Sequence, residues 1–133
     1  MFVKPEVVIF DLDGTILNTL PTHSKMQQVM GRIAPMFGFP AGYKEAMNFN
    51  GRETFKVFQE LGLKSWQKWI HIACWRILER YYCPPRAGFN ANAVIEMLRA
   101  SGVVVGILTN RSSRIMRAMK TSGLNYEEFE FII

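Results

Sequence analysis

The stretch "VVIFDLDGTILNT", residues 7–19, decides the fold. Its four consecutive apolar residues, 7–10, are typical of a strand covered on both faces, as in the middle of a parallel sheet. Two aspartates, Asp11 and Asp13, follow at once, and Gly14 lets the backbone turn tightly or approach a ligand closely. Ligand sites of open parallel sheets lie at the carboxyl ends of the strands. The segment therefore predicts an α/β fold with a polar site at the end of its first strand.

The C-terminal half of the chain continues this pattern. Two more apolar segments, 103–108 and 129–133, are predicted as strands. A helix at 91–101, between Asn90 and Gly102, precedes the first of them, and a helix at 113–121, capped by Ser112 or Ser113, separates the two. Strand, helix and strand in this order form parallel crossover units. The expected core is a parallel, Rossmann-like sheet.

Residues 20–83 contain no convincing strand and are predicted as helices at about 20–36, 53–61 and 65–82. The last helix carries an apolar and aromatic stripe at spacings of three and four, which favours a helix-packing core over a ligand-stacking face. His23 and His71 are expected in ordinary positions on helix surfaces. The domain prediction is a core of 1–18 plus 84–133 and an inserted all-helical module, 19–83.

Composition narrows the class of protein. The length of 133 residues fits one domain or a small core with an insertion, and 49% hydrophobic residues can bury a core. The net charge of +5 is spread without a basic run, so no nucleic-acid partner is expected. Cys74 and Cys83 form no metal-ligand pattern, and no apolar run is long enough to span a membrane. We expect a soluble, cytoplasmic protein.

Polar residues also follow the second predicted strand, where Thr109 and Asn110 stand. If the two strands are neighbours, these side chains meet Asp11 and Asp13 at one edge of the sheet. Two crowded carboxylates repel each other, and a bound Mg²⁺ with its preference for oxygen ligands would relieve that repulsion. One carboxylate could then attack a phosphate, while the other exchanges protons with the leaving group and water.

The motifs "DLDGT", 11–15, and "GILTN", 106–110, in this order and spacing, resemble the haloacid dehalogenase (HAD) superfamily. The stretch "PPRAGFNANAVIEMLRASGVVVGILTN" resembles the family's approach to its second motif, so the resemblance covers the whole chain. The overall pattern is similar to phosphoglycolate-phosphatase-like members with a small helical cap. The helical insert would be that cap, which closes over the site and selects the substrate.

The resemblance implies a role for each motif residue. Asp11 would be the nucleophile and a magnesium ligand, and Asp13 the general acid/base, with its backbone carbonyl also on the metal. Thr109 and Asn110 would hold the phosphoryl group, near Gly14. The stretch "FNGRETF", 49–55, resembles the loop of the cap that reaches the substrate, so Arg52 is either a substrate contact or a solvated surface arginine. An aspartate at 13 favours phosphate monoester hydrolysis or phosphomutase chemistry.

Two parts that the resemblance places beyond the third strand are not found there in these 133 residues: a lysine, often in "KP", and an acidic "GDxxxD" motif. Lys120 cannot replace the lysine, because a helix rising ~1.5 Å per residue carries it away from the site. Without the strand that bears the acidic motif, the first strand becomes an apolar edge that invites pairing with another chain. We therefore expect an N-terminal part of a longer protein or a dependence on a partner, through homo-oligomers or strand exchange at that edge.

Three hypotheses of function remain at this point. The first is a magnesium-dependent phosphohydrolase of the HAD type that acts on a small phosphorylated metabolite through an aspartyl phosphate, with weak or no activity in this shortened form alone. The second is a non-catalytic binding or interaction module of the same fold that needs a partner chain. The third, a basic helical nucleic-acid binder, is disfavoured by the scattered charge.

Overall fold

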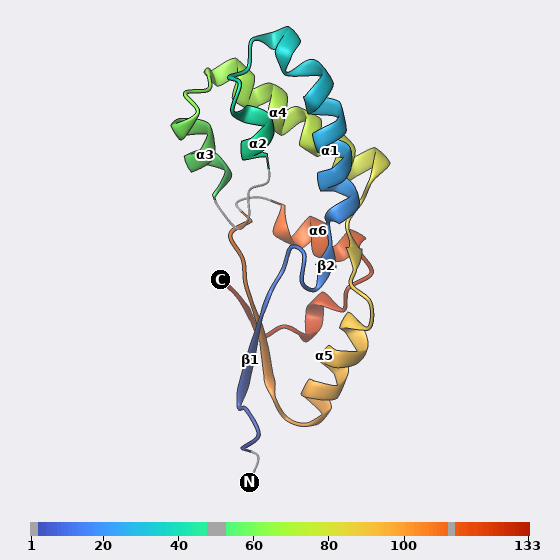
Figure 1. Cartoon of the computed structure of the whole chain (residues 1–133). Coiled ribbons are helices and arrows are strands. Elements are labelled where there is room, and N and C mark those ends of the chain that lie inside the picture. Colours follow the sequence, from blue (N-terminus) through green and yellow to red (C-terminus); the bar gives the residue numbers. More distant parts are fainter. Residues whose placement is uncertain (1–2, 48–52, 112–113) are drawn as a thin grey trace. The chain divides into compact units, whose positions relative to one another are not determined.

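The computed structural model describes residues 3–47, 53–111 and 114–133 (Figure 1). The chain forms two compact units, an α/β unit of Met1–Leu20 with Pro84–Ile133 and a helical unit of Pro21–Cys83. Each unit has a hydrophobic core of its own.

The α/β unit contains a three-stranded parallel sheet, which confirms the predicted fold class. Its strands are β1 (Val7–Asp11), β4 (Val104–Leu108) and β5 (Phe131–Ile132), in the spatial order β1-β4-β5. Helix α5 (Ala91–Ala100) precedes β4, and helix α6 (Ile115–Thr121) connects β4 to β5 (Figure 1). Each element lies within a few residues of its predicted place, and the last strand is shorter than expected.

The central strand β4 is the most buried of the three. Val105 and Ile107 are fully buried, and Ile107 belongs to the core that includes Ile95 of α5 and Met119 of α6. Both helices therefore pack against the sheet face that carries Ile107. On the other face, an added Cβ at Gly106 would lie 2.2 Å from the Phe131 ring, so this position requires glycine for the close approach of the ring.

Strand β1 lies at one edge of the described sheet and pairs with β4 alone. Its side chains alternate between the two faces. Val7 and Ile9 are 47% and 51% exposed, whereas Val8 and Phe10 are partly buried. The prediction that residues 7–10 form a strand covered on both faces is therefore wrong for this structure. The expectation that this segment forms an apolar edge strand agrees with it.

A second, two-stranded sheet was not predicted. Strand β2 (Leu17–Asn18) pairs antiparallel with β3 (Arg86–Ala87), which lies far along the chain. The pairing is extended by a hydrogen bond of 2.7 Å from the Gly88 N–H to the Ile16 carbonyl. This small sheet holds together the two segments that leave and re-enter the α/β unit.

The helical unit has more and shorter helices than predicted. Its helices are α1 (Leu20–Ile33), α2 (Tyr43–Ala46), α3 (Thr54–Glu60) and α4 (Ser65–Ile77), with a 3₁₀ turn at Pro35–Phe37 and a π-helical turn at Leu78–Tyr82. Helix α1 begins at Leu20, the last residue of the first segment of the α/β unit. The buried core of this unit consists of Met26, Met30, Ala34, Phe39, Tyr43, Met47, Phe58, Leu63 and Leu78.

Helix α4 buries only part of the predicted apolar stripe. Ile70 and Cys74 of the stripe, and Leu78 just after the helix, pack in the core of this unit. Trp66, Trp69 and Ile77 of the stripe are 46%, 62% and 50% exposed, and the buried positions of the helix are instead Gln67 and His71. Polar residues can occupy the buried face because each is hydrogen-bonded there. The Gln67 amide donates to the Phe37 and Gly38 carbonyls at 3.1 and 3.0 Å.

His71 is 3% exposed, so its expected place on a helix surface is wrong. Its Nδ1 lies 2.5 Å from the hydroxyl oxygen of Tyr43. Its ring packs edge-on against the ring of Phe58, with 4.7 Å between the two ring centroids. Burial disfavours the charged form and lowers the pKa of His71 to about 4. Two causes raise the pKa of Tyr43 well above its usual range: burial is the larger, and the electrostatic interaction with Cys74 is the smaller. The pair is therefore neutral near pH 7.

Among the residues that the structure describes, no helix is both long enough and apolar enough to cross a membrane.

Candidate active site

The first two polar motifs lie at the carboxyl ends of adjacent strands. Asp11 is the last residue of β1 and pairs in register with Leu108, the last residue of β4. Thr109 follows Leu108 directly, and its N–H donates to the Ile133 carbonyl at 2.9 Å. Parallel pairing thus brings Asp11 and Thr109 to neighbouring positions at the carboxyl ends of β1 and β4.

A tight turn after β1 positions Asp13. The Leu17 N–H donates to the Leu12 carbonyl at 2.9 Å, and the Gly14 N–H donates to the Leu17 carbonyl at 2.8 Å. Gly14 has φ +79°, a left-handed conformation that glycine adopts without strain. Leu12 is fully buried and anchors the turn in the core, which leaves the flanking aspartates directed out of it.

Asp11 is exposed and is held by its own loop. The Thr15 hydroxyl donates to Asp11 Oδ2 at 3.3 Å, which restricts the carboxylate without neutralising it. Thr15 was quoted in the first motif but was given no role by the sequence. A hydroxyl four residues after the carboxylate reaches back because the intervening turn reverses the chain.

Asp13 forms a bidentate ion pair with Arg111. Arg111 Nε lies 2.9 Å from Asp13 Oδ2, and its Nη2 lies 2.9 Å from Oδ1. The side chain of Asp13 is 25% exposed and that of Arg111 is 9% exposed. The pair joins the loop after β1 to the loop after β4, 98 residues apart in the chain. Sequence reasoning missed Arg111, since a single arginine after a Thr-Asn pair gives no distinctive pattern.

The second loop has a local hydrogen bond of its own. The Arg111 N–H donates to the Thr109 hydroxyl oxygen at 3.1 Å, which fixes the rotamer of Thr109. Asn110 is exposed between them. The site therefore brings together Asp11, Asp13, Gly14, Thr109 and Asn110. Arg52 and the predicted helix cap at Ser112 or Ser113 lie outside the described residues.

The donors present suit a hard divalent cation only in part. The Asp11 carboxylate and the Asp13 backbone carbonyl are oxygen ligands of the kind that Mg²⁺ prefers. Within residues 3–47, 53–111 and 114–133, however, no three His, Cys, Asp or Glu side chains group closely enough to hold a metal ion. The carboxylate of Asp13 is already paired with Arg111. The described residues thus offer donors of the right kind and no complete set of side-chain ligands.

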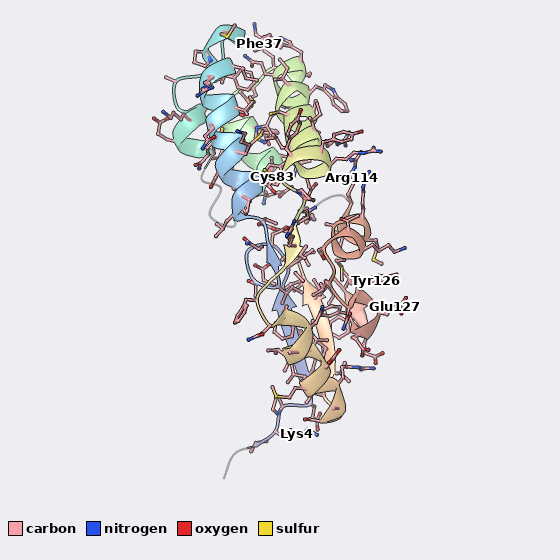
Figure 2. The ribbon with its side chains drawn as sticks, turned by 90° about the vertical axis from the view of Figure 1, so that its right-hand side faces the viewer. Lys4, Phe37, Cys83, Arg114, Tyr126 and Glu127 are labelled. Carbon is pink, nitrogen blue, oxygen red and sulfur yellow. The ribbon has the colours of Figure 1, made fainter. Side chains whose placement is uncertain are left out.

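Lys120 lies elsewhere in the α/β unit. Its Nζ is 5.5 Å from the ring centroid of Tyr126, which Figure 2 labels near α6. It stands near the end of α6, whereas Thr109 precedes that helix. The contact with Tyr126 agrees with the exclusion of Lys120 from the site.

Comparison with known families identifies this arrangement. A family profile for haloacid dehalogenase-like hydrolases matches residues 8–133. The matched region includes both motifs and the helical unit between them. No curated protein matches the chain.

Several solved structures share the fold. A predicted phosphoglycolate phosphatase from Haemophilus somnus is 16% identical, with a TM-score of 0.60 over 97% of this chain and 62% of its own. An HAD phosphatase from Thermococcus onnurineus is 22% identical, with a TM-score of 0.58 over 96% of this chain and 61% of its own. An HAD family hydrolase from Deinococcus radiodurans with bound phosphate and sodium is 19% identical, with a TM-score of 0.62 over 97% and 57%. This chain thus spans about three fifths of the length of these proteins.

Proposed function

The chain belongs to the haloacid dehalogenase-like hydrolases, and from this we propose that it is a phosphohydrolase that acts on a small phosphate monoester through an aspartyl phosphate. The observation that carries the proposal is the parallel register of β1 and β4, which sets Asp11 beside Thr109. The Deinococcus radiodurans structure, which shares this fold, contains a bound phosphate, and a phosphate ligand agrees with the proposal.

In the proposed reaction, an Asp11 carboxylate oxygen attacks phosphorus, and the bond from phosphorus to the ester oxygen breaks. The leaving oxygen takes a proton from the Asp13 carboxyl group. Water then attacks the aspartyl phosphate and gives a proton back to Asp13, which releases orthophosphate and restores Asp11. The Thr109 hydroxyl and the Asn110 amide would orient the phosphoryl oxygens, and Gly14 would let the backbone approach them.

We assign the divalent cation as Mg²⁺, held by the Asp11 carboxylate and the Asp13 carbonyl, with water or further ligands completing the shell. When bound, the ion would offset charge on the phosphoryl oxygens. The helical unit is proposed to be the cap, with Arg52 as a substrate contact. Because these 133 residues hold neither the family's lysine beyond the third strand nor a "GDxxxD" motif, their turnover alone should be slow.

A phosphatase assay with p-nitrophenyl phosphate and a panel of small monoesters, with and without Mg²⁺, tests the proposal. Slow hydrolysis that requires Mg²⁺ and is lost in Asp11→Asn supports it. The control is Glu127→Gln, an exposed acid on the 3₁₀ turn that should leave the rate unchanged. Hydrolysis that survives Asp11→Asn would contradict the proposed nucleophile, and turnover near the ~10 s⁻¹ typical of enzymes would contradict the slow rate.

A second candidate function is a non-catalytic module of the same fold that binds phosphate ligands or a partner chain. The Asp13–Arg111 ion pair favours it, since the carboxyl proposed as proton donor is engaged by a guanidinium. Phosphate binding without any turnover, in the same assay conditions, would support this alternative over the enzyme.

The edge strand suggests the partner. We propose that a second copy of the chain pairs along β1, whose outer side has no strand partner among the described residues. Val7 and Ile9 are about half exposed there, and unprotected apolar edges favour pairing. Light scattering over a concentration series should show dimers that Ile9→Lys disperses. A monomer at every concentration would remove this proposal and leave the phosphate site untouched.

A further inference from the structure

Arg111 connects the two loops of the site in a way that the proposed roles do not yet explain. Its backbone N–H contacts the Thr109 hydroxyl oxygen, and its guanidinium contacts both oxygens of Asp13. Thr109 is the proposed phosphate contact and Asp13 the proposed proton donor. One residue is thus attached to both the binding and the proton-transfer sides of the site.

The charges of the described loops leave a deficit for an anionic substrate. Asp11 and Asp13 contribute two negative charges. A phosphate dianion that enters beside Asp11 therefore requires positive charge close to it. Lys120 contacts Tyr126 instead. Among the described residues of the two loops, Arg111 carries a positive charge and contacts both Asp13 and Thr109.

The geometry of the guanidinium suits an exchange of partners. Its planar fork binds a carboxylate and a phosphate by the same pair of parallel N–H···O bonds. The Asp13 carboxylate is 25% exposed, so water can solvate it when the guanidinium leaves. The Arg111 side chain is 9% exposed, so the ion that replaces Asp13 must be delivered to a largely enclosed place.

We propose that Arg111 is a phosphate-binding residue that changes partners when a ligand arrives. In the ligand-free chain its guanidinium pairs with Asp13, and when a phosphate lies between Asp11 and Thr109 it turns to the phosphate oxygens. Asp13 is then released to exchange protons with the leaving group. This inference rests on the proposed phosphate site and adds a cation to it from the chain's own residues.

Orthophosphate binding, measured by isothermal titration calorimetry on the 133-residue chain at fixed Mg²⁺ and ionic strength, tests this exchange. Arg111→Met should weaken binding about tenfold or more, since charge-assisted hydrogen bonds are lost. Arg111→Lys keeps the positive charge and loses the bidentate guanidinium, so its affinity for orthophosphate should lie between those of the wild type and Arg111→Met. Arg99→Met is the matched control: Arg99 is another ion-paired arginine of the same unit, bound to Glu130, and its loss should change affinity less than twofold.

The double variant of Asp13→Asn and Arg111→Met distinguishes an arginine that changes partners from one that acts as a fixed charge. If Arg111 must leave Asp13 to reach phosphate, Asp13→Asn removes the competition, and Arg111→Met then weakens binding more in that background than in the wild type. Equal effects of Arg111→Met in both backgrounds, or an effect below twofold, would overturn the proposal and leave Arg111 a tether. Circular dichroism should show each variant folded, and Arg111→Lys gives the readout if Arg111→Met is not.

Thr109→Val distinguishes failure of the inference from failure of the proposed function. Phosphate binding that depends on Thr109 but not on Arg111 would refute the exchange alone. A wild-type chain that binds no orthophosphate, or binds it equally well after Thr109→Val, would refute the phosphate site and the role of Arg111 together.

Discussion

The two units each contain a polar pair that joins distant segments, and the pairs differ in what surrounds them. Tyr43 and His71 of the helical unit are 2% and 3% exposed, and burial keeps both neutral near pH 7. Asp13 and Arg111 of the α/β unit are 25% and 9% exposed and form an ion pair. The first pair satisfies polar groups inside a core, whereas the second retains charge beside strand ends that a ligand can reach. Contact geometry alone would not separate these two roles.

Acid should produce the largest change in the free energy of unfolding, through His71 of the helical unit. The pKa of His71 is about 4 in the folded chain and about 6.5 unfolded. Above pH 6.5 both states are neutral, so the free energy of unfolding does not depend on this group. Between pH 6.5 and 4 the unfolded state binds the proton first, and on the order of 3 kcal/mol of stability is lost. Below pH 4 this contribution stays constant.

Urea unfolding followed by tryptophan fluorescence measures this loss, because Trp66, Trp69 and Trp75 all lie on α4. His71→Gln, which does not titrate, should lose this part of the pH dependence. A wild-type curve that is flat from pH 6.5 to 4 would show that His71 is solvated, and the contrast between the two pairs would disappear.

Tyr43→Phe should cost about 1–3 kcal/mol of stability, because it removes the hydroxyl that contacts His71 inside the core. Tyr81→Phe is the matched control, since Tyr81 is 66% exposed, and it should change the free energy of unfolding by less than about 0.5 kcal/mol. The same fluorescence-detected titration compares them. Equal effects of the two variants would indicate that the buried hydroxyl contributes nothing specific.

Arg111→Met should cost less, about 1 kcal/mol, because the partly exposed Asp13 regains water when its partner is lost. Urea unfolding followed by far-ultraviolet circular dichroism gives the value. A loss above about 3 kcal/mol, the range of a fully buried ion pair, would mean that the Asp13–Arg111 pair serves the fold as the Tyr43–His71 pair does.

The smallest effect is expected on the outer face of α4. Trp69 is 62% exposed, so Trp69→Ala should change the free energy of unfolding by less than about 0.5 kcal/mol, measured by circular dichroism. A cost of about 3 kcal/mol, typical of a buried tryptophan, would show that this face is covered and would restore the sequence-based interpretation of the stripe.

The sheet and its two helices were predictable because their signals are local. Apolar runs mark β1 and β4, and Gly102, which was predicted to follow the helix before β4, has the left-handed φ of +75° that is typical of such a helix end. Strand β2 was missed because two residues carry no periodicity and its pairing with β3 depends on contacts across the inserted unit. These contacts form only in the folded chain.

The buried face of α4 was predicted only in part, for a related reason. Hydrophobicity alone favours burial of Trp66 and Trp69, but the core accepts Gln67 and His71, whose polar atoms find partners on other segments. The positions of Asp11 and Thr109 at neighbouring strand ends followed from the general rule for parallel sheets. Arg111 did not, since its importance depends on meeting Asp13 across 98 residues.

The chain segments that enter and leave the helical unit contact each other at two places. Inside that unit the Thr22 hydroxyl donates to the Cys83 carbonyl at 2.7 Å, and inside the α/β unit β2 pairs with β3. A segment whose ends are adjacent can be removed, enlarged or exchanged without forcing its host to unfold, since a short loop bridges the gap. The helical unit could therefore be shortened or replaced while the sheet that carries Asp11 and Thr109 keeps its register.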